Sequence, residues 1–216
     1  DIDKMVKMTE AVVKATHLPV TVKTRLGWDD TTKNIEEVAE RLQDIGIQAL
    51  TIHGRTRAQL YKGEADWTLI REIKRNPRIK IPIFGNGDVD SIRKAAEWRL
   101  EFEVDGIMIG RAAIGYPWIF REIRHFFNTG EILPGPTVEE RVSVCRTHFE
   151  KSLAWKGPKV GIFEMRRHYA NYFKGLPDFK GYRMQLVKEE NIETIHSILD
   201  EVADKYHNVQ PLNEMA

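Results

Sequence analysis

The sequence predicts an α/β fold: the C-terminal half of a (β/α)8 TIM barrel with about four parallel strands, followed by a small all-helical domain. Short β-like runs alternate with helical segments, and 30, 33 and 24 residues separate their ends, which fall at Lys23, His53, Asn86 and Gly110. One βα unit takes about 30 residues, and repeated units build a parallel sheet. Beyond Pro117 only helical periodicity continues, which predicts the second, helical part.

Apolar spacing predicts the elements of the first part in chain order. Residues 2–16 and 34–45 place apolar side chains on one helical face, and Gly46 is a natural helix stop. Asp66 is expected to cap a helix that carries Trp67, Ile70 and Ile73. The remaining predicted elements are a helix at 89–98 and strands at 19–24, 47–52, 81–84 and 104–109.

The number of strands decides the architecture we expect. A closed barrel needs eight strands and typically about 250 residues, whereas this chain shows four strands in 216 residues and opens on a helix. We therefore expect the second half of a barrel with the first half missing. Because the chain does not begin with Met, we also expect that its N-terminus has been cut. The structural alternative is an open, doubly wound sheet of four strands.

The second part is predicted to be a helical domain over residues 137–216, after a first domain over residues 1–130. A short helix at 117–128 ends at Asn128-Thr129-Gly130, and a Pro- and Gly-rich linker follows at 133–136. Thr137 and Glu140 have the spacing of a capping box. Three further helices are expected at 138–156, 160–174 and about 184–206.

Composition narrows the class of protein. Hydrophobic residues make up 42% and charged residues 30% of the chain, and the net charge is +1, which is typical of a soluble globular protein. Cys145 is the single cysteine, so no intrachain disulfide can form, and a reducing, cytoplasmic compartment fits. The chain has no apolar stretch of the roughly 18 residues that span a bilayer, no signal peptide at its start and no metal-binding motif.

Two glycine turns lie where predicted strands end, at Gly85-Asn86-Gly87-Asp88 and at Gly110-Arg111-Ala112. Glycine lets a backbone approach a ligand closely, and a helix beginning just beyond supplies N–H groups for a phosphate. The bland alternatives are that Asp88 only caps a helix near Val89, that Asn86 and Gly87 only form a turn, and that Arg111 is a surface charge. Two such turns on consecutive βα units favour a phosphate site at the end of the array.

Polar side chains also end the two earlier strands. Lys23 and Arg25 point to the same side of their strand, because side chains alternate with a period of two. These two cations either bind an anion at the strand end or only form a solvated strand end. His53 opens the turn His53-Gly54-Arg55-Thr56. A histidine there bonds a cofactor, acts as an acid or base, or only caps the strand; its position at the next strand end after a lysine favours a functional role.

The helical part has an uneven charge. Residues 141–183 contain ten Lys and Arg and three acidic residues, while the last helix is acidic. Aromatic residues are interleaved with the basic ones, among them Trp155, Phe163, Tyr169, Tyr172, Phe173 and Tyr182. Basic helices with aromatic residues suit a nucleic-acid backbone and stacked bases. The alternative is a solvated helix surface over a small aromatic core, to which half of these aromatic residues are expected to belong. Cys145, in a helix, is expected to be a buried hydrophobe.

Taken together, these residues resemble the tRNA-dihydrouridine synthases, with the greatest similarity to the bacterial B-type branch. The resemblance covers nearly the whole chain. It rests on five ordered motifs: Val22–Gly27, His53–Arg57, Gly85–Val89, Met108–Ala112, and Met165–His168 with Lys174–Pro177.

The resemblance implies an enzyme with a (β/α)8 barrel, an FMN cofactor and a helical tRNA-binding domain. In the family NADPH reduces FMN, the flavin passes hydride to C6 of a uridine, and a cysteine acid protonates C5. Carried over by motif, the cofactor-binding residues would be Lys23, His53, Asn86, Gly87, Asp88, Gly110 and Arg111. The tRNA-binding residues would be Arg25, Arg55, Arg166, Arg167 and His168.

This chain departs from the family pattern in three places. The Asn-x-Gly-Cys-Pro segment that carries the family's acid cysteine is absent, as are the first four strands, so no catalytic residue is assigned and we expect the chain alone to be inactive. Asp178-Phe179 follows Leu176-Pro177, where the family usually has Gly-Ala. Open barrel edges predict a homodimer or pairing with the missing half. Two alternative functions remain for the chain: an FMN oxidoreductase like dihydroorotate dehydrogenase, or a non-enzymatic RNA-binding fragment.

Overall fold

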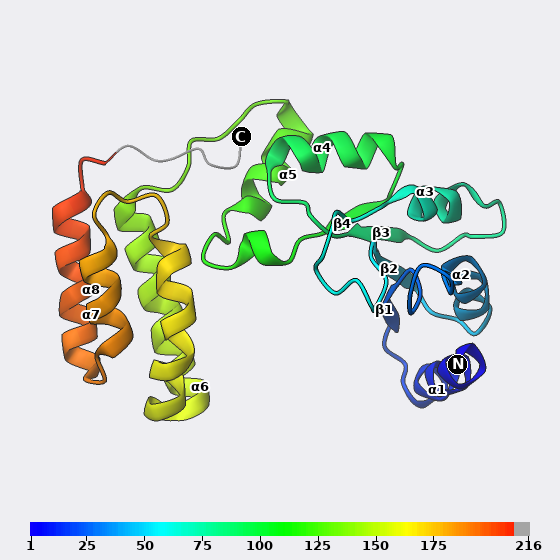
Figure 1. Ribbon diagram of the computed structural model, residues 1–216, viewed down its shortest axis with the longest axis horizontal. Coiled ribbons are helices and arrows are strands. Elements are labelled where there is room, and N and C mark those ends of the chain that lie inside the picture. The colour runs from blue at the N-terminus through cyan, green and yellow to red at the C-terminus, as the bar shows by residue number, and fades with distance from the viewer. Residues whose placement is uncertain (210–216) are drawn as a thin grey trace. The chain divides into compact units, whose positions relative to one another are not determined.

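The computed structural model describes residues 1–209, and the chain divides into two compact units between Gly110 and Arg111 (Figure 1). This division lies earlier than the predicted boundary at 130–137. The reason is packing: Trp118 belongs to the hydrophobic core of the second unit, and Tyr116 packs against that core. Gly115, at φ 74°, fits closely against Asn171. The segment after Gly110 is therefore part of the helical unit.

The first unit is built on four parallel strands, β1 (Thr21–Arg25), β2 (Ala49–His53), β3 (Ile83–Asn86) and β4 (Gly106–Met108). They lie side by side in chain order, β1-β2-β3-β4. A doubly wound sheet reverses its strand order at a switch point, whereas this order advances as in a barrel. The predicted α/β class with four parallel strands is confirmed. β1 and β4 form the two edges of this sheet.

The helices of this unit are α1 (Ile2–Ala15), α2 (Ile35–Asp44), α3 (Thr68–Arg75) and α4 (Ile92–Glu101), all close to their predicted positions. α2 buries one apolar stripe, made of Ile35, Val38, Ala39 and Leu42, and ends before Gly46 at φ 96°. α1 differs, because it has no buried residue and its Met8 and Val12 are exposed. The amphipathic pattern of this segment therefore predicts the helix correctly, although the apolar face of α1 is not buried.

Trp67 is the largest buried side chain of the first unit. Its indole packs against Trp98 with ring centroids 4.8 Å apart and against Phe102 at 5.7 Å. Two glycines give it room: a Cβ at Gly54 would lie 2.8 Å from the ring, and one at Gly85 would lie 2.0 Å from it. Large aromatic side chains dominate core energetics, so these glycines are required by packing.

The second unit is helical: a 3-10 turn η1 (Arg111–Ala113), then α5 (Ile119–Thr129), α6 (Val138–Tyr172), α7 (Lys180–Lys188) and α8 (Ile192–Tyr206). Thr137 and Glu140 form the predicted capping box. α6 contains the predicted break, because Gly157 has φ 77° and Pro158 follows it. The chain turns back there, so that Gly161 packs against Ser152 and Leu153.

The single helix predicted over 184–206 is wrong, because α7 and α8 are separate helices. The backbone is extended at Glu189, where α7 ends, and the side chain of Asn191 accepts a hydrogen bond from the Thr194 N–H to begin α8. An Asn at the N-cap stabilises a helix start by about 1 kcal/mol. The break between α7 and α8 therefore depends on the N-cap residue Asn191, because the residues between the two helices include neither Gly nor Pro.

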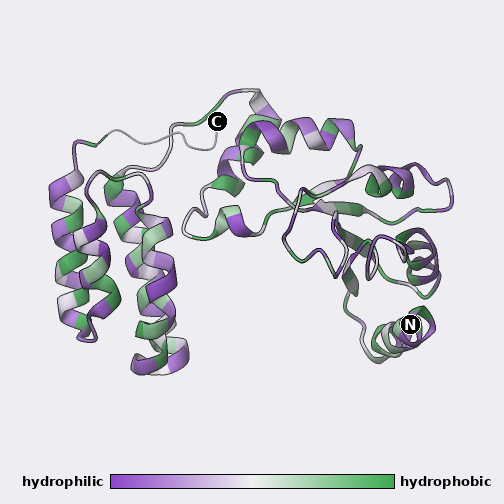
Figure 2. Ribbon diagram, viewed as in Figure 1, coloured by the Kyte–Doolittle hydropathy of each residue, from purple (hydrophilic) through white to green (hydrophobic). Residues whose placement is uncertain are grey.

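α6, α7 and α8 pack on one another around a core that includes Cys145, Phe149, Met165 and Tyr169. Figure 2 shows apolar and hydrophilic residues alternating along these helices, as expected of helices with one buried side. Cys145 is fully buried and burial raises the pKa of its thiol, which confirms the expectation of a buried hydrophobe. Within residues 1–209, no helix is both long enough and apolar enough to cross a membrane.

Candidate functional site

The predicted site residues of the first unit lie in a row at the carboxyl end of the sheet. The register pairs Arg25 with His53, His53 with Asn86, and Asn86 with Met108. One residue from each strand thus stands beside the next, at the end where parallel α/β folds bind ligands. Lys23 lies two residues before Arg25 on the same side of β1.

Lys23 and Arg25 make the β1 end of the row cationic. One guanidinium nitrogen of Arg25 donates to the carbonyl oxygens of Thr56 at 2.8 Å and Leu60 at 3.0 Å, which fixes the side chain against the loop after β2. Lys23 is exposed, and partial desolvation together with the nearby Arg25 lowers the pKa of its ammonium. Two neighbouring cations that repel each other favour a bound anion.

His53 is buried at the centre of the row. Burial, then the charges of Arg25, Lys23 and Arg55, lower its pKa to about 4. The imidazole is therefore neutral at physiological pH, with one ring nitrogen as a donor and the other as an acceptor. A neutral ring beside three cations suits hydrogen bonding to a cofactor ring better than proton transfer near neutral pH.

Arg55 and Asp88 form a buried ion pair behind the row. The guanidinium donates to both carboxylate oxygens, at 2.8 and 2.6 Å, and also to the carbonyls of Lys62 and Gly63. Asp88 further accepts the Ala65 N–H at 2.8 Å. Arg55 is only 2% exposed, so the structure does not place it among cations that RNA can reach. It connects the loop after β2 to the turn after β3.

The alternative that Asp88 only caps a helix near Val89 is wrong. Ser91 caps α4 by accepting the Lys94 N–H, and α4 begins at Ile92. Asp88 instead adopts φ 56° and turns its carboxylate towards Arg55. An aspartate tolerates this left-handed conformation better than most residues.

The turn after β3 is compact. Gly87 has φ 119°, and a Cβ there would meet Ala65 at 2.7 Å and the His53 ring at 2.8 Å. The side-chain amide of Asn86 donates to the Met108 carbonyl at 2.7 Å, which holds the turn to the end of β4. Glycine at 87 is thus required by the turn and by His53, and not by open space for a ligand.

Gly110 differs, because a Cβ there would meet nothing within 4 Å. Open space at a strand end is what a closely approaching ligand needs. The helix expected just beyond this turn is only the three-residue turn η1, which begins at Arg111, and the short helix predicted at 117–128 follows as α5 from Ile119. Arg111 belongs to the second unit, whereas Gly110 ends the first.

The residues of this row fit an anionic cofactor. Lys23 and Arg25 provide positive charge, neutral His53 provides a donor or acceptor, and Gly110 provides free space. A flavin mononucleotide needs these features, because its phosphate is anionic and its ring has hydrogen-bonding edges. Among the described residues, no group of three or more His, Cys, Asp and Glu side chains is arranged to hold a metal ion.

The helical residues predicted to contact RNA lie in the second half of α6, and both arginines are paired within the protein. Arg166 donates to Glu190 at 3.2 Å and stacks on Phe163 with its guanidinium carbon 4.2 Å from the ring centre. Arg167 donates to Glu164 at 2.6 Å and is 68% exposed.

His168 packs against His148, with ring centroids 4.8 Å apart, and His148 lies 3.1 Å from the Tyr172 hydroxyl. Burial is the main cause that lowers the pKa of both histidines. Of the eight aromatic residues in the basic segment, Trp155 is 87% exposed, and five are buried: Phe149, Tyr169, Tyr172, Phe173 and Phe179. At least half of them are thus in the core, as expected.

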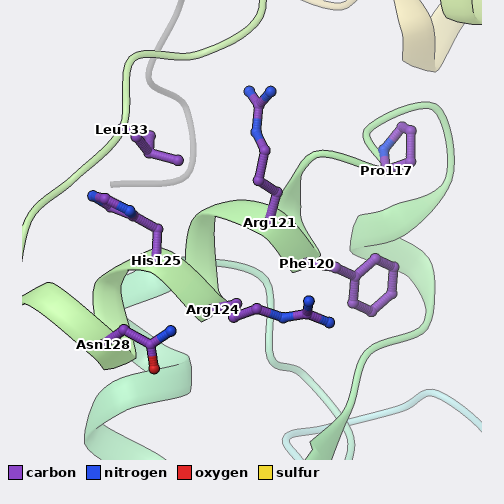
Figure 3. A pocket seen from close by; sticks show the side chains of 7 residues that line it. All are labelled: Pro117, Phe120, Arg121, Arg124, His125, Asn128 and Leu133. Atoms are coloured by element: carbon purple, nitrogen blue, oxygen red, sulfur yellow. The ribbon is translucent and has the colours of Figure 1, made fainter.

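The sequence motifs did not indicate a basic hollow that lies on α5. Arg121, Arg124, His125 and Asn128 line it, together with three apolar residues (Figure 3). Their spacing of three and four residues places them on one face of a helix, and this spacing is a signal that could have identified them.

Comparison with known proteins identifies a family whose fold agrees with the parallel sheet and the helices that follow it. A family model described as "Dihydrouridine synthase (Dus)" matches residues 1–208. The chain belongs to the dihydrouridine synthase family. Membership agrees with a barrel-type sheet followed by helices, and it confirms the resemblance found in the motifs.

Individual relatives support the same assignment. A protein of Rickettsia conorii named "Probable tRNA-dihydrouridine synthase" is 38% identical over 211 residues, covering 97% of this chain and 62% of the relative. The "tRNA-dihydrouridine synthase B" of Pseudomonas aeruginosa is 43% identical over 179 residues, covering 83% and 53%. A Synechocystis relative, "Probable tRNA-dihydrouridine synthase 1", is 43% identical over 90% of this chain and 54% of its own length. The similarity to B-named proteins supports the B-type branch, and the chain spans less than two thirds of these relatives.

Proposed function

We propose that this chain carries the FMN-binding strand ends and the RNA-binding helices of a cytoplasmic tRNA-dihydrouridine synthase. The observation that carries the proposal is the row from Arg25 through His53 to Asn86, with Lys23 two residues before Arg25, at the carboxyl end of a parallel sheet in a chain of the dihydrouridine synthase family. Family membership favours uridine in tRNA as the substrate over the small molecules of other flavin barrels.

The residues of the row have separate tasks in this proposal. Lys23 and Arg25 attract and orient an anionic, electron-rich ligand, and neutral His53 offers it a hydrogen bond. Asn86, Gly87 and Gly110 shape the turns near the phosphate, with Arg111 beginning the next segment. Asp88 holds Arg55, so that both support the turns from behind. FMN, once bound and reduced by NADPH, supplies a hydride.

In this proposal the acid that completes a uridine reduction comes from outside the described residues. Cys145 is fully buried in the helical core and so out of reach of a substrate, and burial raises the pKa of its thiol, which makes it a weaker proton donor. We infer that these 216 residues alone do not form dihydrouridine. The open strands β1 and β4 would pair with a second copy or with further barrel strands; a clean monomer in size-exclusion chromatography contradicts this pairing.

Binding of tRNA tests the proposal. We expect the chain to bind tRNA with an affinity that falls steeply with salt, because phosphate contacts release counterions. Replacing Arg166 and Arg167 together by alanine should weaken binding severalfold, since both lie on the basic helix. Fluorescence anisotropy at several salt concentrations measures this. An affinity for tRNA no greater than that for a neutral polymer contradicts the proposal.

A further inference from the structure

The face of α5 that the proposed function does not use is hollowed. A hollow of about 630 Å³ is lined by Pro117, Phe120, Arg121, Arg124, His125, Asn128 and Leu133. Figure 3 shows Phe120 and Arg124 on the same side of α5, and His125 turned towards Leu133. All these residues lie in the second unit.

The two arginines of this hollow differ from three arginines of the helical unit that have acidic partners. Arg146, Arg166 and Arg167 each form an ion pair, with Asp200, Glu190 and Glu164 respectively. Within residues 1–209, Arg121 and Arg124 form no ion pair, and both side chains are exposed. An external anion can therefore bind these two charges without the additional cost of breaking an internal ion pair.

The acidic residues near the hollow neutralise it only in part. Glu122 follows Arg121, but its side chain is buried and accepts a hydrogen bond from the Tyr116 hydroxyl at 2.9 Å. The exposed Glu131 lies 4.0 Å from His125, at the edge of ion-pair distance. Among the described residues, Arg121 and Arg124 thus form no direct ion pair, although the Glu122 carboxylate partly compensates the charge of Arg121.

Apolar surface beside these cations adds the second kind of contact that a nucleotide needs, which is a surface for its base. Phe120 is 50% exposed on the helix, and it is four residues from Arg124 and so on the same face. Exposed aromatic rings stack unpaired bases, and guanidinium groups bind phosphates with paired hydrogen bonds. Asn128 adds an amide that can bond a ribose or a base edge.

We propose that the α5 hollow binds one nucleotide of RNA, with Arg121 and Arg124 on its phosphate and Phe120 against its base. This site is separate from the basic segment of α6, and it rests on the proposed function in that the RNA is tRNA. It adds a contact that positions the substrate and takes no part in the chemical step.

The slope of tRNA affinity against salt concentration tests the phosphate contacts. Each contact contributes about 0.7 to 0.9 to the slope of log affinity against log salt. Because both arginines are proposed to bind the same phosphate, the double variant Arg121→Ala/Arg124→Ala should reduce the slope by about 0.7 to 0.9. The matched control Arg93→Ala/Arg99→Ala removes two arginines from exposed positions on α4 and should leave the slope within error of the parent chain.

Phe120→Ala tests the base contact separately. Loss of a stacked base weakens binding about fivefold or more, and the salt slope should stay unchanged because no charge is removed. Inorganic phosphate, added at constant ionic strength, should not displace tRNA if the base is part of the contact. An unchanged slope in the double arginine variant, an unchanged affinity for Phe120→Ala, or displacement by phosphate overturns the proposal. If the parent chain fails to bind tRNA, the proposed function falls with it, whereas binding with unaffected variants removes only this site.

Discussion

Replacing Arg55 by alanine is expected to destabilise the first unit by about 3–5 kcal/mol, which is the cost of removing one partner of a buried ion pair. The change leaves the Asp88 carboxylate buried without the guanidinium that donates to both its oxygens. It also removes the guanidinium N–H groups from which the carbonyls of Lys62 and Gly63 accept hydrogen bonds. The loop after β2 and the turn after β3 should both loosen.

Hydrogen exchange measured by mass spectrometry can follow this loss locally, because amide protection in β2 and β3 reports the stability of the first unit. Arg57→Ala provides a matched control, since Arg57 is an exposed arginine two residues further along the same loop. Exposed substitutions usually change stability by about 0.5 kcal/mol or less. Equal protection in the two variants would show that the buried pair does not hold this edge of the sheet.

Gly85→Ala is expected to cost about 3 kcal/mol or more, at the upper end of the range for an overfilled core. The new methyl group would lie 2.0 Å from Cζ3 of Trp67, and 2.4 and 2.5 Å from two further atoms of the same six-membered ring. Trp67 is itself held between Trp98 and Phe102, so it has little freedom to move away.

A second substitution tests this cause directly. Trp67→Phe removes part of the indole that the methyl group would strike, so Gly85→Ala should cost less in the Trp67→Phe background than in the parent chain. Gly110→Ala is the control, because a Cβ there meets nothing within 4 Å. Denaturant unfolding of the four proteins in the cycle gives the coupling between the two positions. Simple additivity would contradict the packing explanation for Gly85.

Most of the fold could be predicted from the sequence because its elements have strong periodic patterns. The stripe of α2 and the capping box of α6 are local features, and the structure places both where the pattern indicates. The failures are local too. The break between α7 and α8 depends on the capping side chain of Asn191, and the short η1 after Gly110 has no distinct pattern.

The candidate site was predictable only in part. Parallel register aligns residues that end neighbouring strands, so the row through His53 and Asn86 follows from strand order. The pairing of Arg55 with Asp88 joins residues 33 positions apart, and no local pattern in either segment indicates it. The role of Gly85 likewise depends on Trp67, which reaches it from another element.

The affinity of the chain for FMN relative to riboflavin tests the central claim most directly. The two flavins share the same ring system and differ in the phosphate, which the site is proposed to hold. Charge-assisted hydrogen bonds to a phosphate contribute about 1.5–3 kcal/mol, so FMN should bind about tenfold more tightly or better. Flavin fluorescence titration gives both dissociation constants. Preferential binding of FMN, lost with added salt, is the predicted result; equal affinity for the two flavins, or no binding of either, would contradict a flavin-phosphate site at these strand ends.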